Sequence, residues 1–143
     1  MTDLQGAIGL EQLKQLDKFI EERAKWAKWY TKELADIEWI KTPFVLEGNT
    51  HSWQSFVLYV DPSNTPVPRN NLMKSLQVSG ISTRPGTHAV HMLKFYKKKY
   101  KINPSDFPIA KLCELNSIAI PLHNKMSKED YDYVVTNIKL SSC

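Results

Sequence analysis

One segment of the sequence, GISTRPGTHAVHMLKFY from Gly80 to Tyr96, concentrates polar side chains able to bind a ligand. Its candidate binding residues are Thr83, Arg84, Thr87, His88 and His91. The run ISTR predicts a short strand that ends at Pro85-Gly86, and ligand sites tend to form on loops at strand ends. The sequence leaves an alternative open, in which Pro85-Gly86 is only a turn and His91 only packs within a helix.

Other chemistries lack their signatures. The chain has no nucleophile elbow, P-loop or dinucleotide-binding glycine pattern. His88 and His91 are spaced to bind zinc from one helix face, but no third ligand follows at a suitable distance, so we expect no metal site. The two cysteines, Cys113 and Cys143, form neither a disulfide framework nor a metal motif, which favours two free thiols in a reducing, cytoplasmic setting.

The formal net charge of +4 comes from many lysines and few arginines. The only dense basic run is KFYKKKYK, from Lys94 to Lys101. A solvated helix end is the simpler interpretation, and a phosphate-contacting patch is the alternative. Because arginine is little used, we do not expect nucleic acid as a partner. No apolar run approaches the ~20 residues that span a bilayer, so we expect no membrane partner.

A long helix must position whatever follows it. Thr2 and Gln5 have the spacing of a capping box, and the sequence predicts a single helix from about Thr2 to about Ala35. That length suits a connecting element. The apolar residues that recur at spacings of three and four on one face are Leu13, Leu16, Ile20, Ala24, Ala27, Tyr30 and Leu34.

The rest of the chain alternates strands and helices. Strands are predicted at 37–41, 53–60, 81–84 and 117–122, and helices at 69–80, 89–100, 106–116 and 127–139. Ser127 and Asp130 are placed to cap the last helix, and its buried stripe is predicted to be Tyr131, Val134, Val135 and Ile138. We expect a single α/β (α+β) domain over residues 1–143, with a small mixed or antiparallel sheet of three or four strands and helices packed on one face.

Four stretches in register resemble one known family. MTDLQGAIGLEQLKQLD is similar to R-M-T-D-L-Q-A-A-I-G-x-x-Q-L-x-x-L-D of the DegT/DnrJ/StrS sugar aminotransferases, which are fold-type I enzymes that use pyridoxal phosphate. HSWQSFVLYVD resembles the histidine-led strand of that family, and GISTRPGTHAVHMLKFYKKKY the segment after its small-domain helix. The closing stretch from Asp106 to Lys139 is similar to F-P-x-A-…-S-L-P-L-x-x-x-M-T-x-x-E-x-x-Y-V.

The resemblance implies that Met1 corresponds to an internal methionine and that the chain is a C-terminal small domain without its large cofactor-binding domain. The family activity is transfer of an amine, usually from glutamate, to a keto-sugar carried on a nucleotide, in amino-sugar or surface-polysaccharide synthesis. Since the family's Schiff-base lysine lies upstream of M-T-D-L-Q, the resemblance implies no catalytic residue here, no cofactor bound by this fragment and no activity alone.

The same resemblance carries over the small-domain side of the substrate cleft. His91 matches the recurrent histidine after the T-R strand, and Thr83 and Arg84 match the strand end, where Arg84 would pair with a phosphate or carboxylate. Thr87 and His88 complete the candidate set. The commoner family pattern has a histidine close after T-R, whereas Pro85-Gly86 stands there in this sequence, which bears on the identity of the substrate.

The family is usually a homodimer, so the resemblance also implies self-association. Separation from a large domain is expected to expose Trp26, Trp29 and Tyr30 on the first helix. Two other functions remain open on the sequence: a non-catalytic module that binds a nucleotide sugar, and a basic domain that binds nucleic acid through Lys94 to Lys101.

Overall fold

A four-stranded antiparallel sheet organises the fold, which the computed structural model describes for residues 1–141. The strands are β1 (Ile40–Lys41), β2 (Phe56–Val60), β3 (Arg84–Pro85) and β4 (Ser117–Ile120). Their order across the sheet is β1-β2-β4-β3, so the two longer strands lie in the middle. Phe56 is opposite Ile120 and Leu58 is opposite Ile118. The predicted small antiparallel sheet is therefore confirmed. The Cys143 thiol lies outside the described residues.

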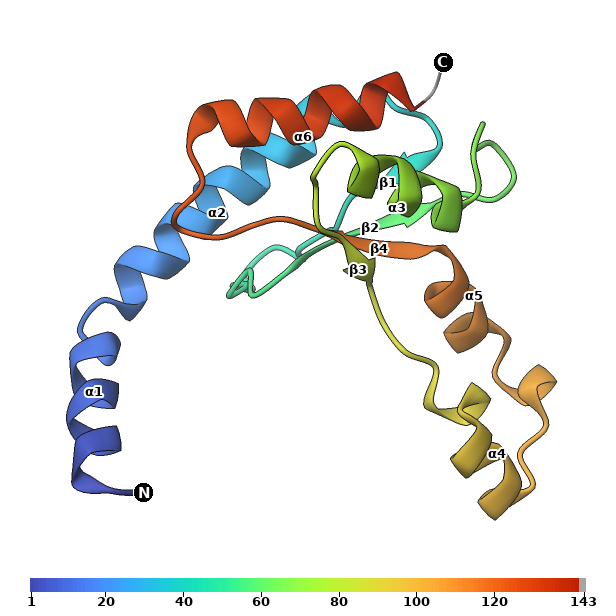
Figure 1. The fold of residues 1–143 in the computed structure, drawn as a ribbon, viewed down its shortest axis with the longest axis horizontal. Helices are drawn as coiled ribbons and strands as arrows, with labels where there is room; N and C mark the ends of the chain where they lie inside the picture. The colour runs from blue at the N-terminus through green and yellow to red at the C-terminus, as the bar shows by residue number, and fades with distance from the viewer. Residues whose placement is uncertain (142–143) are drawn as a thin grey trace.

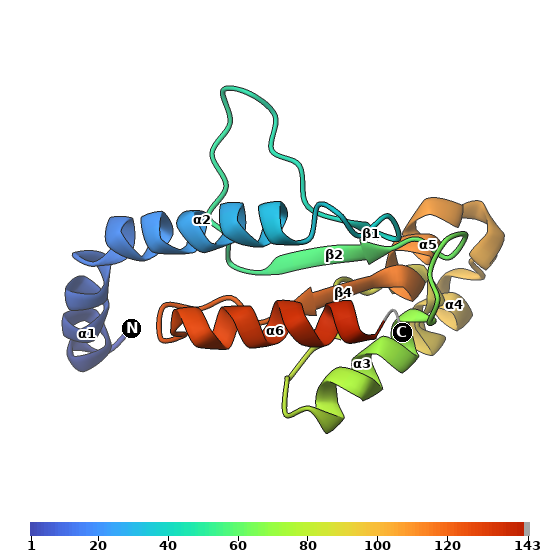
Figure 2. The ribbon, with the colours of Figure 1, turned by 90° about the horizontal axis from the view of Figure 1, so that it is seen from above.

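The described residues form six α-helices, which surround or extend the sheet. They are α1 (Asp3–Leu13), α2 (Leu16–Glu33), α3 (Arg69–Val78), α4 (Lys94–Tyr100), α5 (Pro108–Asn116) and α6 (Lys128–Leu140), with short 3-10 turns η1 (Val90–Met92) and η2 (Pro104–Asp106). Helices α2, α3 and α6 lie over one face of the sheet (Figure 2). Because neighbours along a strand point to opposite faces, Phe56, Leu58 and Val60 all enter this core and are buried.

Within residues 1–141, no such layer of helices covers the opposite face of the sheet. Figure 1 shows α1 at one end and α4 with α5 at the other, both turned away from the α2–α6 layer, so that the molecule has the outline of an arch. Val57 and Tyr59 point to this open face and are only half-buried. Large apolar side chains stay exposed on the two arms: Leu4, Ile8, Leu10 and Leu13 on one, and Phe95, Phe107, Ile109 and Leu112 on the other.

The predicted single helix over 2–35 is wrong in one respect, because the chain breaks at Lys14-Gln15 into α1 and α2. The capping box of Thr2 and Gln5 is present, as predicted. No residue of α1 is buried, and the predicted apolar face is buried only toward its end, at Ala27, Tyr30 and Leu34. Helices owe most of their stability to the packing of one face. Because α1 buries no residue among those described, no packing holds it in line with α2.

Several boundaries also differ from prediction. Strand β2 begins at Phe56 because Trp53 has a positive φ of 50°. Strand β3 starts only at Arg84, and the strand predicted at 37–41 is reduced to Ile40–Lys41. The helix predicted at 89–100 is interrupted by Leu93, whose ψ of 130° is extended. Helix α3 ends as expected before Gly80, which has a φ of +76°.

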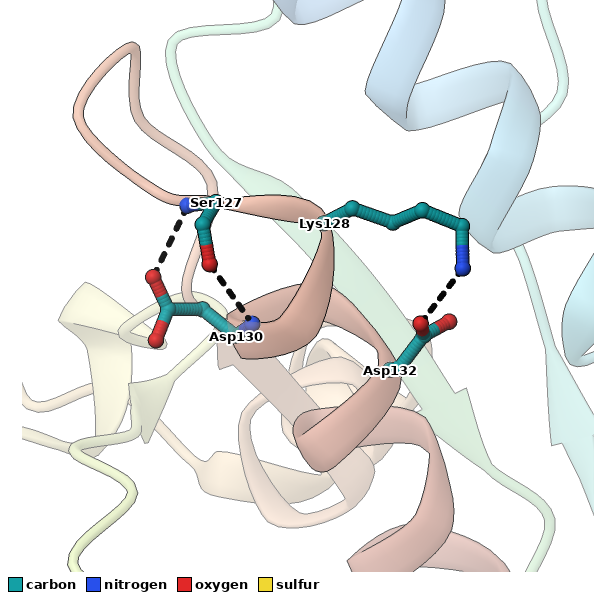
Figure 3. Close-up of polar contacts among 4 residues, drawn as sticks. All are labelled: Ser127, Lys128, Asp130 and Asp132. Carbon is teal, nitrogen blue, oxygen red and sulfur yellow. Dashed lines mark hydrogen bonds and ion pairs between the residues drawn. The ribbon is translucent and has the colours of Figure 1, made fainter.

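Helix α6 matches its prediction most closely. Figure 3 shows the capping box, in which the Asp130 carboxylate accepts from the Ser127 N–H at 2.8 Å and the Ser127 hydroxyl accepts from the Asp130 N–H at 3.2 Å. One turn on, Lys128 pairs with Asp132. The predicted stripe of Tyr131, Val134, Val135 and Ile138 is buried. The cap therefore fixes where the helix begins, and the apolar stripe decides which face meets the sheet.

Two buried tyrosines join α2, α6 and the connection between β4 and α6. The Tyr30 hydroxyl donates to the Pro121 carbonyl at 3.0 Å, and the Tyr131 hydroxyl donates to the His123 carbonyl at 3.2 Å. Trp26 stacks on Tyr131 with ring centroids 4.1 Å apart. Burial raises the pKa of Tyr131 to about 12 and also raises that of Tyr30, so both hydroxyls keep their protons and act as donors at neutral pH.

Arg69 anchors α5 to α3. Its side chain is 8% exposed, and it donates from Nη2 to the Glu114 carbonyl at 2.8 Å and from Nε to the Leu115 carbonyl at 3.0 Å. These carbonyls lie in the last turn of α5, where they have no helical partner and where a cation is favoured. Burial lowers the pKa of Arg69 and the nearby Glu114 carboxylate opposes this shift, and the guanidinium keeps its charge.

We predict that Arg69→Ala lowers the free energy of unfolding by about 3 kcal/mol, because it removes two charge-assisted hydrogen bonds and leaves the carbonyls of Glu114 and Leu115 without this donor. Urea denaturation followed by circular dichroism measures the change. Lys74→Ala is the matched control, since Lys74 is an exposed cation on the same helix. Equal stability of the two variants would contradict the role of Arg69.

Candidate functional site

The five candidate residues lie along the path that the chain takes after β3, but they do not converge on one point. Arg84 is exposed in β3 and lies opposite Ala119. Thr83 is half-buried just before it, whereas Thr87 and His88 are exposed. His91, in η1, is 8% exposed. Arg84, Thr87 and His88 are thus open to solvent, whereas the imidazole of His91 is buried.

Gly86 lets this path cross the open face of the sheet. A Cβ at Gly86 would overlap Val57 Cγ1 and would lie 2.7 Å from Ser117 Cβ and Oγ, which is closer than real Cβ contacts. The Gly86 N–H donates to the Ser117 carbonyl at 3.1 Å. Pro85 belongs to β3 and is therefore not only a turn residue. The Pro-Gly pair continues the sheet and then presses the backbone onto it.

Two buried polar atoms on this side of the described structure have no hydrogen-bond partner, His91 Nε2 and Ser117 Oγ. The His91 ring rests against Phe107 with centroids 5.1 Å apart. Buried polar groups are nearly always satisfied, so unsatisfied ones point to a ligand, a water or a further piece of protein. Ser117 was not among the predicted residues, because a serine at the start of an apolar strand gives no signal in sequence.

Glu114 positions the segment that carries His91. Its carboxylate accepts from the Ala89 N–H at 2.7 Å, while its carbonyl accepts from buried Arg69. Hydrogen bonds of charged side chains therefore connect α3, α5 and η1, in addition to apolar packing. Neither Glu114 nor Arg69 was singled out from the sequence, since charged residues in helices are usually solvated.

Two hollows flank the segment. The larger, about 680 Å³, lies where β4 meets α6; Arg84, His123 and Tyr133 are among the polar residues that line it. The smaller, about 320 Å³, lies on the open face and is lined by Thr87, Cys113 and other residues around Gly86. Arg84 and Thr87 consequently face different hollows. His88 lines neither of them.

None of the lysines is buried, although a lysine that forms a Schiff base is normally desolvated. All sixteen lysines of the chain are exposed. The pKa of Lys128 is raised, chiefly by its hydrogen bond to Asp132, whereas a Schiff-base lysine needs a lowered pKa. None of the lysines is buried in the way that such a group would be. Across residues 1–141, no three histidine, cysteine or acidic side chains come together to hold a metal ion.

The comparison with protein families matches nearly the whole chain. Residues 1–139 fit the model of the DegT/DnrJ/EryC1/StrS aminotransferase family. The chain belongs to this family. The resemblance seen in the sequence is therefore confirmed.

Curated relatives are much longer than this chain. The spore coat polysaccharide biosynthesis protein SpsC of Bacillus subtilis is 33% identical over 140 residues, which are 97% of this chain and 36% of that protein. The uncharacterized protein MJ1066 of Methanocaldococcus jannaschii is 29% identical over 139 residues, again 36% of its length. The chain thus spans about a third of the curated relatives that it matches.

Solved structures share the fold. The putative sugar aminotransferase Spr1654 of Streptococcus pneumoniae, in its pyridoxal-phosphate form, superposes with a TM-score of 0.86 at 24% identity over 99% of this chain and 36% of that one. Helicobacter pylori PseC, an aminotransferase involved in the biosynthesis of pseudoaminic acid, gives a TM-score of 0.89 at 17% identity over 99% of this chain and 38% of that one.

Among the described residues, no helix is long and apolar enough to cross a bilayer.

We predict that Gly86→Ala destabilises this chain by about 1–3 kcal/mol, because the added methyl must displace the side chains of Val57 and Ser117. Thermal unfolding followed by circular dichroism measures it. Gly9→Ala is the control, since nothing lies within 4 Å of a Cβ there. If both variants melt together, the close approach of Gly86 to the sheet does not matter for stability.

Proposed function

We propose that the chain is the C-terminal small domain of a pyridoxal-phosphate-dependent aminotransferase that acts on a nucleotide-linked keto-sugar, in the synthesis of amino sugars or surface polysaccharide in the cytoplasm. The observation that carries this proposal is the match of residues 1–139 to the family, over only about a third of its relatives. The domain by itself is inactive under this proposal, because its exposed lysines do not fit the cofactor.

The shape of the molecule supports a missing neighbour. The open face of the sheet lies on the side of the arch away from the core helices (Figure 1), and α1 and α5, which flank it, carry exposed apolar side chains such as Ile8 and Ile109. Exposed apolar surface of this extent tends to be an interface. The unsatisfied His91 Nε2 and Ser117 Oγ lie on the same side and would find partners there. We assign this side to the large domain and the substrate cleft.

The candidate residues receive roles consistent with that cleft. Arg84 has a free, planar guanidinium that suits a phosphate or carboxylate of the substrate. His91, whose buried Nε2 has no partner among the described residues, is assigned a hydrogen bond to the sugar or the diphosphate in the completed cleft. Thr83, Thr87 and His88 lie on the same segment of the chain and are assigned weaker contacts with the substrate. Pyridoxal phosphate supplies the electron sink for amine transfer, and the groups that hold it would come from outside this chain.

A second candidate function is binding of a nucleotide sugar without turnover. Arg84, free and beside a hollow of about 680 Å³, favours it. Calorimetric titration of this chain with a uridine-diphosphate amino sugar separates the two: saturable binding that Arg84→Gln weakens would favour the binding module, whereas a small domain that needs its large domain binds poorly.

We predict that pyridoxal phosphate adds no saturable induced dichroism in the visible range to this chain, since exposed lysines form only nonspecific Schiff bases. Titration followed by absorption and circular dichroism is the measurement. The control is an intact family enzyme, which should give a stoichiometric chiral band. Such a band from this chain would overturn the assignment of the cofactor groups to a missing domain.

We also propose that the isolated chain associates with itself through the exposed apolar residues of α1, and not through Trp26, Trp29 and Tyr30 as the sequence suggested. Tyr30 is fully buried, and Trp26 and Trp29 are half-buried against Tyr131, so the expected exposure of these three is largely wrong. The exposed apolar residues of α1 take their place.

We predict that light scattering over a concentration series shows a mass that rises with concentration, and that Leu4→Glu with Ile8→Glu reduces the rise. The matched control is Gln12→Glu with Gln15→Glu, which adds the same charge to the same region without removing apolar surface. A mass that stays monomeric at every concentration would contradict self-association, and an equal effect of both pairs would contradict the role of the apolar face.

A further inference from the structure

The charge of this protein is divided very unevenly along the chain. From Pro62 to Ser105 there is no aspartate or glutamate, and eight side chains are basic. The rest of the chain holds eleven basic and fifteen acidic side chains, so its formal charge is −4. The net charge of +4 thus conceals a strongly basic central segment. A partner that approaches this segment meets a positive potential, not a mixed one.

Most of that charge sits on one arm of the arch. Five of the eight basic residues lie between Lys94 and Lys101, on or next to α4. In the part of the chain that the structure describes, none of these lysines forms an ion pair. Figure 1 shows α4 at the far end of its arm, away from the sheet and its core helices. The ammonium groups are therefore free to meet an anionic surface.

The arm also carries exposed apolar and aromatic side chains. Tyr96 and Tyr100 are four residues apart on α4 and their ring centroids are 6.2 Å apart, and Leu93 directly precedes the helix. Lys94, Lys97 and Lys98 are interleaved with these residues along the helix, and Lys101 follows at its end. Leu93 is 43% exposed, Phe95 64% and Tyr100 58%, so apolar and aromatic surface is available beside the lysines.

We infer that the α4 arm docks on the surface of a membrane that contains anionic phospholipid. Lysine ammonium groups on long stems reach the headgroup phosphates, while tyrosine and phenylalanine rings settle at the boundary of the acyl chains. This docking places the arm on a bilayer and does not cross it. It departs from the expectation of no membrane partner, which rested only on the lack of a segment that could span a bilayer. It is independent of the proposed enzymatic function.

Nucleic acid fits this arm less well. Single-stranded nucleic acid needs aromatic faces on which bases can stack. Here Tyr96 and Tyr100 stack on each other, and Lys99 lies over Phe95 at 5.5 Å and over Tyr100 at 5.3 Å. The run from Lys94 to Lys101 also contains no arginine, the side chain best suited to bidentate phosphate recognition.

The experiment is co-sedimentation of the chain with large vesicles, of phosphatidylcholine alone or mixed equally with phosphatidylglycerol. We expect binding only to the anionic vesicles, weakened by added salt. The triple variant Lys97→Gln, Lys98→Gln and Lys101→Gln should bind about a hundredfold more weakly, since each lysine near the surface contributes about a factor of five. The variant Phe95→Ser with Tyr100→Ser should retain the salt dependence but bind more weakly at every salt concentration.

The matched control is Lys25→Gln, Lys28→Gln and Lys32→Gln, which removes the same charge from the exposed side of α2. It should keep vesicle binding within about threefold of the unmodified chain, because only lysines close to the surface contribute. Equal losses in the two triple variants would reduce the effect to net charge and overturn the inference. So would tighter binding of a single-stranded DNA oligonucleotide than of anionic vesicles, or the absence of vesicle binding at low salt.

Discussion

The architecture depends on the buried contact between Tyr30 and Tyr131. Both rings are fully enclosed, and each hydroxyl donates to a carbonyl of the connection between β4 and α6. Burying a phenol without a partner is costly, so these two bonds fix the connection as well as the helices. Asn124 in the same connection donates to the Phe19 carbonyl and to the Glu22 carboxylate of α2. The layer over the sheet is thus fixed, and the two arms extend from a rigid centre.

Much of this fold could be predicted from local patterns. The caps at Thr2 and Ser127, the stripe on α6, the stop at Gly80 and the antiparallel sheet all rest on interactions within a few residues or on simple periodicity. The break at Lys14-Gln15 could not be predicted, because the apolar spacing continues across it. The short extents of β1 and β3 likewise depend on which neighbours pair, which spacing does not encode.

The candidate site was predicted only as a segment of sequence. The run from Thr83 to His91 does lie at a strand end beside two hollows, but its side chains divide between them. The residues that shape it come from two distant parts of the chain: Arg69 begins α3, whereas Glu114 and Ser117 lie at the junction of α5 and β4. The hydrogen bonds of buried Arg69 to the α5 carbonyls and the unsatisfied hydroxyl of Ser117 depend on contacts between residues far apart in the sequence. Local sequence patterns therefore cannot predict them, or the close approach of Gly86 to Ser117.

The sheet has a further property at its edges. Both outer strands, β1 and β3, are two residues long, and β3 includes Pro85, which has no N–H to offer. Short edges and an edge proline remove the ladder of free donors and acceptors on which another strand could be templated. A domain with this much uncovered apolar surface would otherwise be at risk of growing into cross-β fibrils. Its geometry directs association toward faces and helices, where contacts remain reversible and of limited size.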